Sequence, residues 1–270
     1  GQTVNVSTLS ALTSALASSS ATIINVSGTI SGSATLNVMS NKTINGVNGA
    51  TLNGIGLSVY TNSNVIIKNL RIQNSPVDGI IVTRSSHHVW IDHCWISGAA
   101  DELIDVSKSA NYVTISWSKF TSSHYGILIG GGSTNTAYRG LFNVTLHHNY
   151  FYDISERVPF ASYGKVHFFN NYVLQENPAY RQPQVHAVIE SNIRVENNYF
   201  KGISNRPIRS LVSEIGGGGQ VLDLNNAYSS CSTNYIDTAP STWAPSYEYM
   251  SALTPAADVP TAVLNGAGPK

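Results

Sequence analysis

The chain has 270 residues, of which 11% are charged, and its formal net charge is zero with a sequence pI of about 7.2. This charge balance excludes a protein that neutralises phosphates with a basic face, so we expect no nucleic-acid partner. Hydrophobic residues make up 42% of the chain, which excludes a flexible linker and predicts a sizeable core. No apolar run reaches the roughly 18 residues of a membrane-spanning helix, so we expect no membrane partner.

The first regular pattern is that of a short helix. Residues 8–17 carry Leu9, Leu12 and Leu16 at helical spacing, and Thr8 can cap their N-terminus. From residue 22 onward the pattern changes to short alternating strands separated by glycine and asparagine. The helix is therefore predicted to cover the open apolar end of the stack that these strands form.

An internal repeat dominates the middle of the chain. Six nine-residue segments superpose without gaps, and each alternates apolar with polar residues in the manner of a strand. The aligned apolar residues at their second positions are Val65, Val89, Val113, Val144, Val166 and Ile193. The successive steps are 24, 24, 31, 22 and 27 residues, so every step is one supersecondary unit long.

These units have no helical pattern between their short strands. Leucine-rich repeats would need leucines at fixed offsets, and propeller blades would need roughly 40 residues or more. The repeat instead predicts an all-β fold, a single-stranded right-handed parallel β-helix with a short N-terminal capping helix. Four positions after each aligned residue we expect a bend, where polar side chains stack and bond along the coils. These side chains are Asn69, His93, Asn170 and Asn197.

Carboxylates gather in the strands that precede the repeats. Asp101 and Asp105 are four residues apart and would face the same side of a regular strand, with Asp78 one coil earlier. Coils stacked about 4.8 Å apart would bring the three together, and clustered carboxylates suit a hard cation such as calcium. The residues alone leave a second interpretation equally open, in which the carboxylates are solvated or pair with the basic residues Arg84, Lys108 or Arg157.

Cysteines and sequons add little to the assignment. Cys94 and Cys231 allow at most one disulfide bond, and Cys94 stands in an apolar strand pattern where a buried free thiol is expected. Four sequons are compatible with a secreted protein, although such strings are also ordinary at strand edges. They begin at Asn5, Asn25, Asn41 and Asn143.

Five motifs follow one another along the chain. They are Trp90-Ile91-Asp92-His93-Cys94, Arg157-x-Pro159, Gly164-Lys165-Val166-His167-x-x-Asn170-Asn171-Tyr172, Val195-Glu196-Asn197-Asn198-Tyr199-Phe200 and Asn265-Gly266-Ala267-Gly268. Together they resemble the pectate lyase and pectin lyase family. The resemblance spans nearly the whole chain as one β-helix domain, residues 1–270, and includes a C-terminal arm at about 228–270 that packs back on the coils.

The resemblance implies a secreted, monomeric enzyme that cleaves the α-1,4 bonds of homogalacturonan, the pectate of plant cell walls, by calcium-assisted β-elimination. Arg157 matches the family's base, which removes the C5 proton before the C4–O4 bond breaks. The metal ligands are then Asp78, Asp101 and Asp105. Because arginine ordinarily has a pKa above about 12, an arginine base implies an alkaline optimum. The residues expected to bind the pectic substrate are His124, Tyr125, Ser162 and Arg206.

Three positions depart from the calcium-dependent members of the family. A second arginine is expected five residues after Arg157, where this chain has Ser162, and Tyr125 replaces a substrate-binding lysine. The first calcium aspartate is expected at Gly79, one residue after Asp78. The loss of two cations leaves open a calcium-independent pectin lyase acting on methyl-esterified substrate, while the retained carboxylates favour a pectate lyase.

Two other interpretations stay open. A non-catalytic polysaccharide-binding protein on the same scaffold would also explain the missing cations. A polygalacturonase hydrolase would use aspartates on neighbouring coils, in Asn-Thr-Asp and Gly-His-Gly strings that this sequence lacks. Assays for unsaturated product, for reducing ends and for binding without turnover separate the three.

Overall fold

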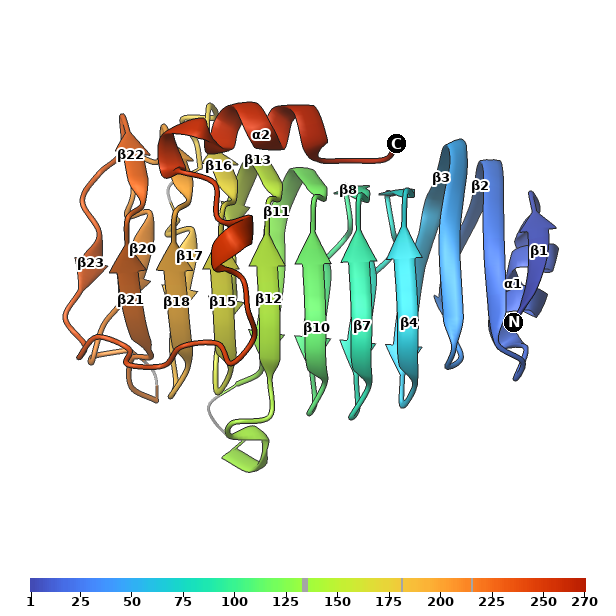
Figure 1. The fold of residues 1–270 in the computed structure, drawn as a ribbon, viewed down its shortest axis with the longest axis horizontal. Helices are drawn as coiled ribbons and strands as arrows, with labels where there is room; N and C mark the ends of the chain where they lie inside the picture. Colours follow the sequence, from blue (N-terminus) through green and yellow to red (C-terminus); the bar gives the residue numbers. More distant parts are fainter. Residues whose placement is uncertain (133–135, 181, 215) are drawn as a thin grey trace.

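A computed structural model describes residues 1–132, 136–180, 182–214 and 216–270. Nearly all of its strands pair in parallel and stack along one axis (Figure 1), which confirms the predicted right-handed parallel β-helix. The first coils are built from long strands, and later coils each contribute one short strand to three parallel columns. The first strands are β1 (Gln2–Val6), β2 (Thr22–Asn37) and β3 (Lys42–Tyr60).

The first column contains the repeat that the sequence predicted. The aligned residues Val65, Val89 and Val113 are cross-strand partners, and the same register continues through Val144, Val166 and Ile193 to Val221. The strands are β4 (Ser63–Lys68), β7 (His87–Asp92), β10 (Asn111–Ser116), β12 (Asn143–His147), β15 (Lys165–Phe169), β18 (Asn192–Glu196) and β21 (Gln220–Leu224).

The other two columns complete each coil, and β11 runs through both. The second column holds β5 (Arg71–Gln73), β8 (Trp95–Ser97), the start of β11 (Lys119–Gly130), β13 (Tyr150–Glu156), β16 (Tyr172–Leu174), β19 (Tyr199–Lys201) and β22 (Ala227–Ser229). The third column holds β6 (Ile80–Thr83), β9 (Glu102–Ser107), the end of β11, β14 (Phe160–Ala161), β17 (Val185–Ala187), β20 (Ile208–Ser210) and β23 (Tyr235–Ile236).

The interior of the stack is apolar and is covered at its N-terminal end. Helix α1 (Leu9–Ala17) begins after Thr8, whose hydroxyl accepts a hydrogen bond from the Ala11 amide, and it buries Leu12 and Leu16 completely. The predicted capping helix is therefore confirmed in place and extent. Inside the coils, four phenylalanine rings lie one above another, with successive centroids 4.8, 6.0 and 6.5 Å apart, at Phe120, Phe151, Phe168 and Phe200.

The predicted bonding along the coils is present at the bends. An amide ladder with Nδ2 to Oδ1 distances of 3.1 to 3.2 Å joins Asn5, Asn25, Asn45 and Asn69, and Asn170 Nδ2 donates to the Asn197 carbonyl at 2.9 Å. Asn69, His93, Asn170 and Asn197 do occupy bends, all with positive φ. A second amide ladder, which the sequence did not predict, lies one residue later in the later coils, where each Nδ2 donates to the next Oδ1 at 2.9 to 3.1 Å, through Asn149, Asn171, Asn198 and Asn226.

The C-terminal arm runs back along the stack. In Figure 1 it crosses in front of β21, β18 and β15, turns at β12 and ends with α2 (Val259–Gly266) over the second column. It includes the short 3-10 helices η2 (Met250–Ala252) and η3 (Ala256–Asp258), and η1 (Thr136–Tyr138) lies before β12. Gly266 lies against the Trp117 ring, and the Gly268 amide donates to the Trp117 carbonyl at 2.8 Å.

Both cysteines are free thiols, and Cys94 is buried, as its sequence context predicted. Among the described residues, no helix is long and apolar enough to span a membrane.

Candidate active site and calcium centre

The candidate site lies on the outer edge of the third column, just before its strands begin. Glu102 is the cross-strand partner of Tyr125, and Asp78 and Glu102 stand at the same offset before the paired residues Ile80 and Ile104. On the next coil, Glu156 pairs with Tyr125 and Arg157 follows it. Three consecutive coil steps therefore align Asp78, Glu102, Tyr125 and Glu156 in one row, and Arg157 follows directly after the end of this row.

Three carboxylates meet at one end of this row. Asp78, Asp101 and Glu102 each present an oxygen within 4.8 Å of the others. Asp78 is only 6% exposed, and its Oδ1 accepts a hydrogen bond from the Glu102 amide at 2.9 Å. Burial, and then the charge of Asp105, raises the pKa of Asp78 to about 6. Burial and a hydrogen bond with Asp101 raise the pKa of Glu102 to about 7, against the opposing charge of Arg157.

Asp105 lies beside this group. Its Oδ2 accepts a hydrogen bond from the Ser107 hydroxyl at 2.9 Å, while its buried Oδ1 has no hydrogen-bond partner among the described residues. Burial raises the pKa of Asp105 to about 6, and the charges of Glu102 and Asp101 add to the effect. Asp105 is thus electrostatically coupled to the carboxylate group without being one of the three within 4.8 Å.

The local backbone explains why Glu102 joins the cluster. The prediction placed Asp101 and Asp105 on one side by regular alternation, but Leu103 and Ile104 are consecutive and both fully buried. Alternation breaks between them, so Glu102 and Asp105 both lie on the outer side. Glu102 was not among the predicted metal ligands, and the two adjacent apolar residues after it are the sequence signal that predicts its position.

Two glycines let the coils approach closely here. A side chain at Gly79 would place its Cβ 2.6 Å from both the Leu103 carbonyl and the Ile96 Cγ2. This position faces the interior and has no room for the aspartate that the family comparison led us to expect there. Asp78, one residue earlier, is the outward-facing position. At Gly126 a Cβ would lie 2.4 Å from the Arg157 carbonyl, so this glycine allows the strand carrying Arg157 to pack in place.

Arg157 closes the other side of the carboxylate group. Its Nη1 forms an ion pair with Glu102 Oε1, and its Cζ lies 3.9 Å from the centroid of the Tyr125 ring. The backbone at Arg157 has φ of 66°, and its carbonyl accepts a hydrogen bond from the Ile127 amide at 2.6 Å. The peptide bond Val158–Pro159 is cis. The guanidinium is thus held over the cleft by a ring below it and a carboxylate beside it.

The remaining predicted substrate residues divide into three cases. His124 is exposed and contacts Glu156 at 3.3 Å, and Tyr125 carries the Arg157 guanidinium. Arg206 lies farther along the stack, over the Tyr235 ring at 4.4 Å. The position of Ser162 does not support its predicted role, because it is fully buried and its hydroxyl bonds both the amide and the carbonyl of Gly131.

The outer face of the third column continues past Phe160 with charged residues that the sequence did not single out. Phe160 pairs with His186, and His186 pairs with Arg209. Glu214 accepts from Arg209 Nε at 2.5 Å and lies 3.2 Å from His186 Nε2. These half-buried side chains extend the candidate cleft along the helix axis. A strand that alternates charged and apolar residues, as around His186, is the only sequence signal for them.

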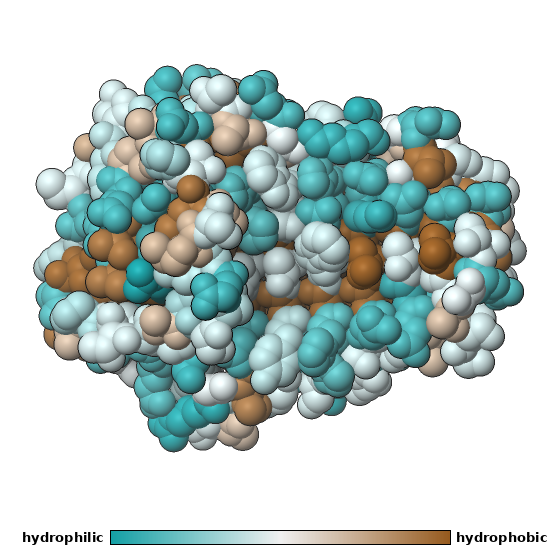
Figure 2. Space-filling model, in the orientation of Figure 1, coloured by the Kyte–Doolittle hydropathy of each residue, from teal (hydrophilic) through white to brown (hydrophobic). Residues whose placement is uncertain are grey.

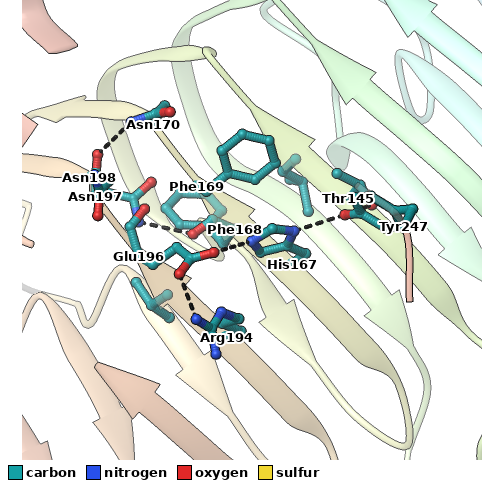
Figure 3. Close-up of polar contacts among 12 residues, drawn as sticks. Thr145, His167, Phe168, Phe169, Asn170, Arg194, Glu196, Asn197, Asn198 and Tyr247 are labelled. Atoms are coloured by element: carbon teal, nitrogen blue, oxygen red, sulfur yellow. Dashed lines mark hydrogen bonds and ion pairs between the residues drawn. The ribbon is translucent and has the colours of Figure 1, made fainter. Parts of the chain in front are cut away.

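A second buried ion pair lies elsewhere and has a different role. Figure 3 shows Glu196 between His167 and Arg194, at 2.7 Å from His167 Nε2 and 2.8 Å from Arg194 Nη2. The other His167 nitrogen lies 2.7 Å from the Tyr247 hydroxyl, which belongs to the C-terminal arm. The partners lower the pKa of Glu196 to about 2 despite its burial, and His167 is fully buried. This network attaches the arm to the coils.

The residues of the cleft fit a calcium ion. Three carboxylates supply only oxygen donors, which calcium prefers, and they lie close enough together to share one cation. Asp105 adds a further carboxylate that interacts electrostatically with this group, and its Oδ1 has no hydrogen-bond partner among the described residues. Burial, together with the charges of the neighbouring carboxylates, raises the pKa of Asp78, Glu102 and Asp105, and a bound cation would relieve the repulsion among them.

A parallel β-helix that carries an arginine beside an acidic cluster on its outer face defines a class of enzymes that cleave acidic polysaccharides. The sequence model of the pectate lyase family matches residues 2–269, and the chain belongs to this family.

Individual relatives agree with this assignment. The chain is 32% identical over 235 residues to pectate lyase plyB of Emericella nidulans, covering 83% of this chain and 71% of that protein. It is 30% identical over 269 residues to the pectate trisaccharide-lyase of Bacillus licheniformis, covering 92% and 76%. A solved pectate lyase from Bacillus sp. N165, bound to trigalacturonate, has the same fold, with a TM-score of 0.83 at 24% identity over 99% of this chain and 93% of that one.

Proposed function

We propose that this protein is a polysaccharide lyase that cleaves pectate by β-elimination, with Arg157 as the base and a calcium ion held by Asp78, Asp101 and Glu102 beside Asp105. The observation that carries the proposal is the ion pair of Arg157 with Glu102 at the edge of the carboxylate group. It supports the role of Arg157 because a sugar carboxylate that contacts this cluster would also lie close to the Arg157 guanidinium. Family membership supports the reaction class.

The reaction asks Arg157 to remove the proton from C5 of a galacturonate unit. The electron pair of the C5–H bond forms the C4–C5 double bond, the C4–O4 bond breaks, and the departing O4 takes a proton from solvent. When bound, calcium would draw electron density from the substrate carboxylate and make the C5 proton more acidic. Because Arg157 pairs with Glu102, substrate binding must exchange that contact for one with the sugar.

The surroundings prepare Arg157 for this role. Tyr125 supports the guanidinium from below and keeps it from folding away from the cleft. The φ of 66° and the hydrogen bond from Ile127 fix the backbone, so the side chain starts from one direction. Only a small fraction of arginine loses its proton near neutral pH, so we expect turnover to rise with pH into the alkaline range.

Two features shape the substrate preference. Tyr125 and Ser162 stand where cations would hold further substrate carboxylates, and Ser162 is buried against Gly131. The cleft therefore has fewer positive contacts for fully ionised polymer, which favours some tolerance of methyl esters. The four carboxylates argue against a calcium-independent pectin lyase, because without a cation they would repel one another.

The decisive experiment compares pectate with highly esterified pectin, each with calcium and with chelator. We expect unsaturated product, seen in the near ultraviolet, from pectate with calcium, and little without it. Product from esterified pectin in chelator would replace this proposal with the pectin lyase. Reducing ends without unsaturation would indicate a hydrolase, and binding without either product would indicate a non-catalytic protein.

We further propose that the protein acts outside the cell as a monomer, because its polymeric substrate is a wall component. Size-exclusion chromatography with light scattering tests the monomer, and fractionation of the producing culture tests secretion. A dimer, or protein confined to cells, would contradict these points without affecting the proposed reaction.

A further inference from the structure

A second hollow lies on a different face of the molecule. It has a volume of about 800 Å³ and opens over the first column, between strands β4, β7, β10 and β12 and the turn of the C-terminal arm at residues 243–247. Figure 1 shows this turn beside β12, and Figure 2 shows a hydrophobic band flanked by hydrophilic residues along the same face. None of the described residues that line it belongs to the acidic cleft.

Exposed aromatic rings form one wall of this groove. Trp90 is 44% exposed and Tyr112 is 56% exposed, on adjacent strands of the first column. Trp90 Nε1 donates to the Ser116 hydroxyl at 2.8 Å, and Ser116 donates to Asp92 at 2.6 Å, so the indole is fixed with part of its surface open. The Tyr112 ring lies 5.1 Å from the His88 ring. These rings are held in place before any ligand arrives.

The opposite wall is equally well anchored. It is formed by Trp243 and Tyr247 of the arm. The Tyr247 hydroxyl bonds Thr145 at 2.8 Å and His167 at 2.7 Å, and this is the attachment drawn in Figure 3. The groove therefore has two aromatic walls whose separation is fixed by a buried network, which reduces the entropy cost of binding a chain between them.

The charges of the groove identify its ligand. Among the described lining residues there is no carboxylate, and Lys165 is the only one with a permanent charge. The other polar groups are amides, hydroxyls and imidazoles, such as Asn64, Thr114 and His147. Aromatic faces suit the C–H faces of sugar rings, and the polar edges suit hydroxyl groups. A polyuronate would bring one negative charge per residue to a groove with one cation, so a neutral chain fits better.

We propose that this groove is a second carbohydrate-binding site that takes a neutral polysaccharide chain. It lies on a face distinct from the acidic cleft, so one molecule can bind a neutral polymer and process an acidic one at the same time. Binding the neutral polymer would raise the local concentration of the enzyme near substrate held in the same material. The site stands on its own residues and does not depend on the proposed lyase activity.

Native affinity electrophoresis through gels containing soluble β-1,4-galactan or hydroxyethyl cellulose tests the site directly. We expect the protein to be retarded by at least one of these polymers in the presence of chelator. The variant Trp90→Thr introduces the residue type of Thr114, the cross-strand partner of Trp90 on the next coil. The variant Tyr112→Asn introduces the residue type of Asn64, which stands at the same offset two coils earlier. Asparagine also tolerates the positive φ of Tyr112.

For each variant, the polymer concentration needed for half-maximal retardation should rise at least tenfold. The rate of pectate cleavage and the thermal unfolding temperature should stay close to those of the wild type. Tyr60→Asn is the matched control, because Tyr60 is an exposed tyrosine outside the groove, 43% exposed against 56% for Tyr112, and it should be retarded like wild type. Binding should also change tryptophan fluorescence, and Trp90→Thr should reduce that change. If Trp90→Thr unfolds, Tyr112→Asn alone decides.

Three results would overturn the site. They are no retardation by either neutral polymer, retardation that both groove variants leave unchanged, and retardation only by polygalacturonate. Loss of pectate cleavage in Arg157 variants with retained galactan or cellulose binding would support two separate sites. Failure of the lyase assay alone leaves this result intact, so the two proposals fail independently.

Discussion

Two buried carboxylates with arginine partners, Glu102 in the cleft and Glu196 beneath the arm, behave in opposite ways. Glu196 bonds His167 and Arg194, which hold its pKa near 2. Glu102 has Arg157, but its burial and the neighbouring carboxylates outweigh that charge and raise its pKa to about 7. A fully paired anion stabilises the fold, whereas crowded anions with one shared arginine store unfavourable energy that a cation or substrate can release.

The largest expected effect is at Arg157. Arg157→Lys keeps the charge but cannot occupy the same position over Tyr125, and pectate cleavage should fall by about 10² to 10⁴. Initial rates of unsaturated product with calcium measure the loss. Arg139→Lys, an exposed arginine paired with Glu190, is the control and should keep full activity. Wild-type activity in Arg157→Lys would contradict the assignment of Arg157 as the base.

The next largest effect is on stability, at Glu196. Glu196→Gln leaves the buried His167 and Arg194 without their anion, and the unfolding free energy should fall by about 3 to 5 kcal/mol. Urea denaturation at pH 7 measures this. The contribution of Glu196 is present above its ordinary pKa and is lost as pH falls toward 2, so the difference should shrink in acid. Glu190→Gln, on the surface, should change little, and an equal loss there would contradict this interpretation.

Calcium affinity distinguishes the cleft from the rest of the surface. Asp101→Asn and Glu102→Gln each remove one of the three clustered carboxylates, and calcium binding should weaken at least about tenfold. Isothermal titration calorimetry measures binding without substrate or turnover. Glu248→Gln removes an exposed carboxylate of the arm and serves as the control. Unchanged affinity in both cleft variants would move the calcium site elsewhere.

The smallest effect should have the opposite sign to that at Glu196. In chelator at pH 8, Asp105→Asn should raise the unfolding free energy by about 1 to 3 kcal/mol, because it removes a buried charge. The pKa of Asp105 is raised to about 6, so the native carboxylate costs stability above that pH and little near pH 4. Urea midpoints at pH 8 and pH 4 test this. A gain at pH 4 as large as at pH 8, or a loss at pH 8, would contradict it.

The regular parts of the molecule were predictable because the repeat has one physical cause. Every coil must bury the same face on its neighbour, so apolar residues recur at the same offset, as at Val65 and Val89. The same logic located the capping helix through Leu12 and Leu16. It failed where alternation breaks, since consecutive buried residues at Leu103 and Ile104 shifted Glu102 into the cleft.

The irregular parts needed three-dimensional structure because their partners are distant in sequence. The buried state of Ser162 depends on the neighbouring coil at Gly131, and the shift from Gly79 to Asp78 depends on Leu103. The aromatic groove pairs Trp90 with an arm more than a hundred residues away. Spacing along one strand contains no information about these contacts.

By itself the sequence determined the β-helix and the length of its coils and predicted a group of carboxylates, while the resemblance to a known family indicated Arg157 as the candidate base. Only the tertiary structure decided which carboxylates meet, which hydroxyl is buried, and that an aromatic groove lies on a different face from the acidic cleft. The reason is that periodic burial is encoded locally in each coil. Electrostatic coupling and the shape of a cleft arise from how separate coils and the arm pack against one another.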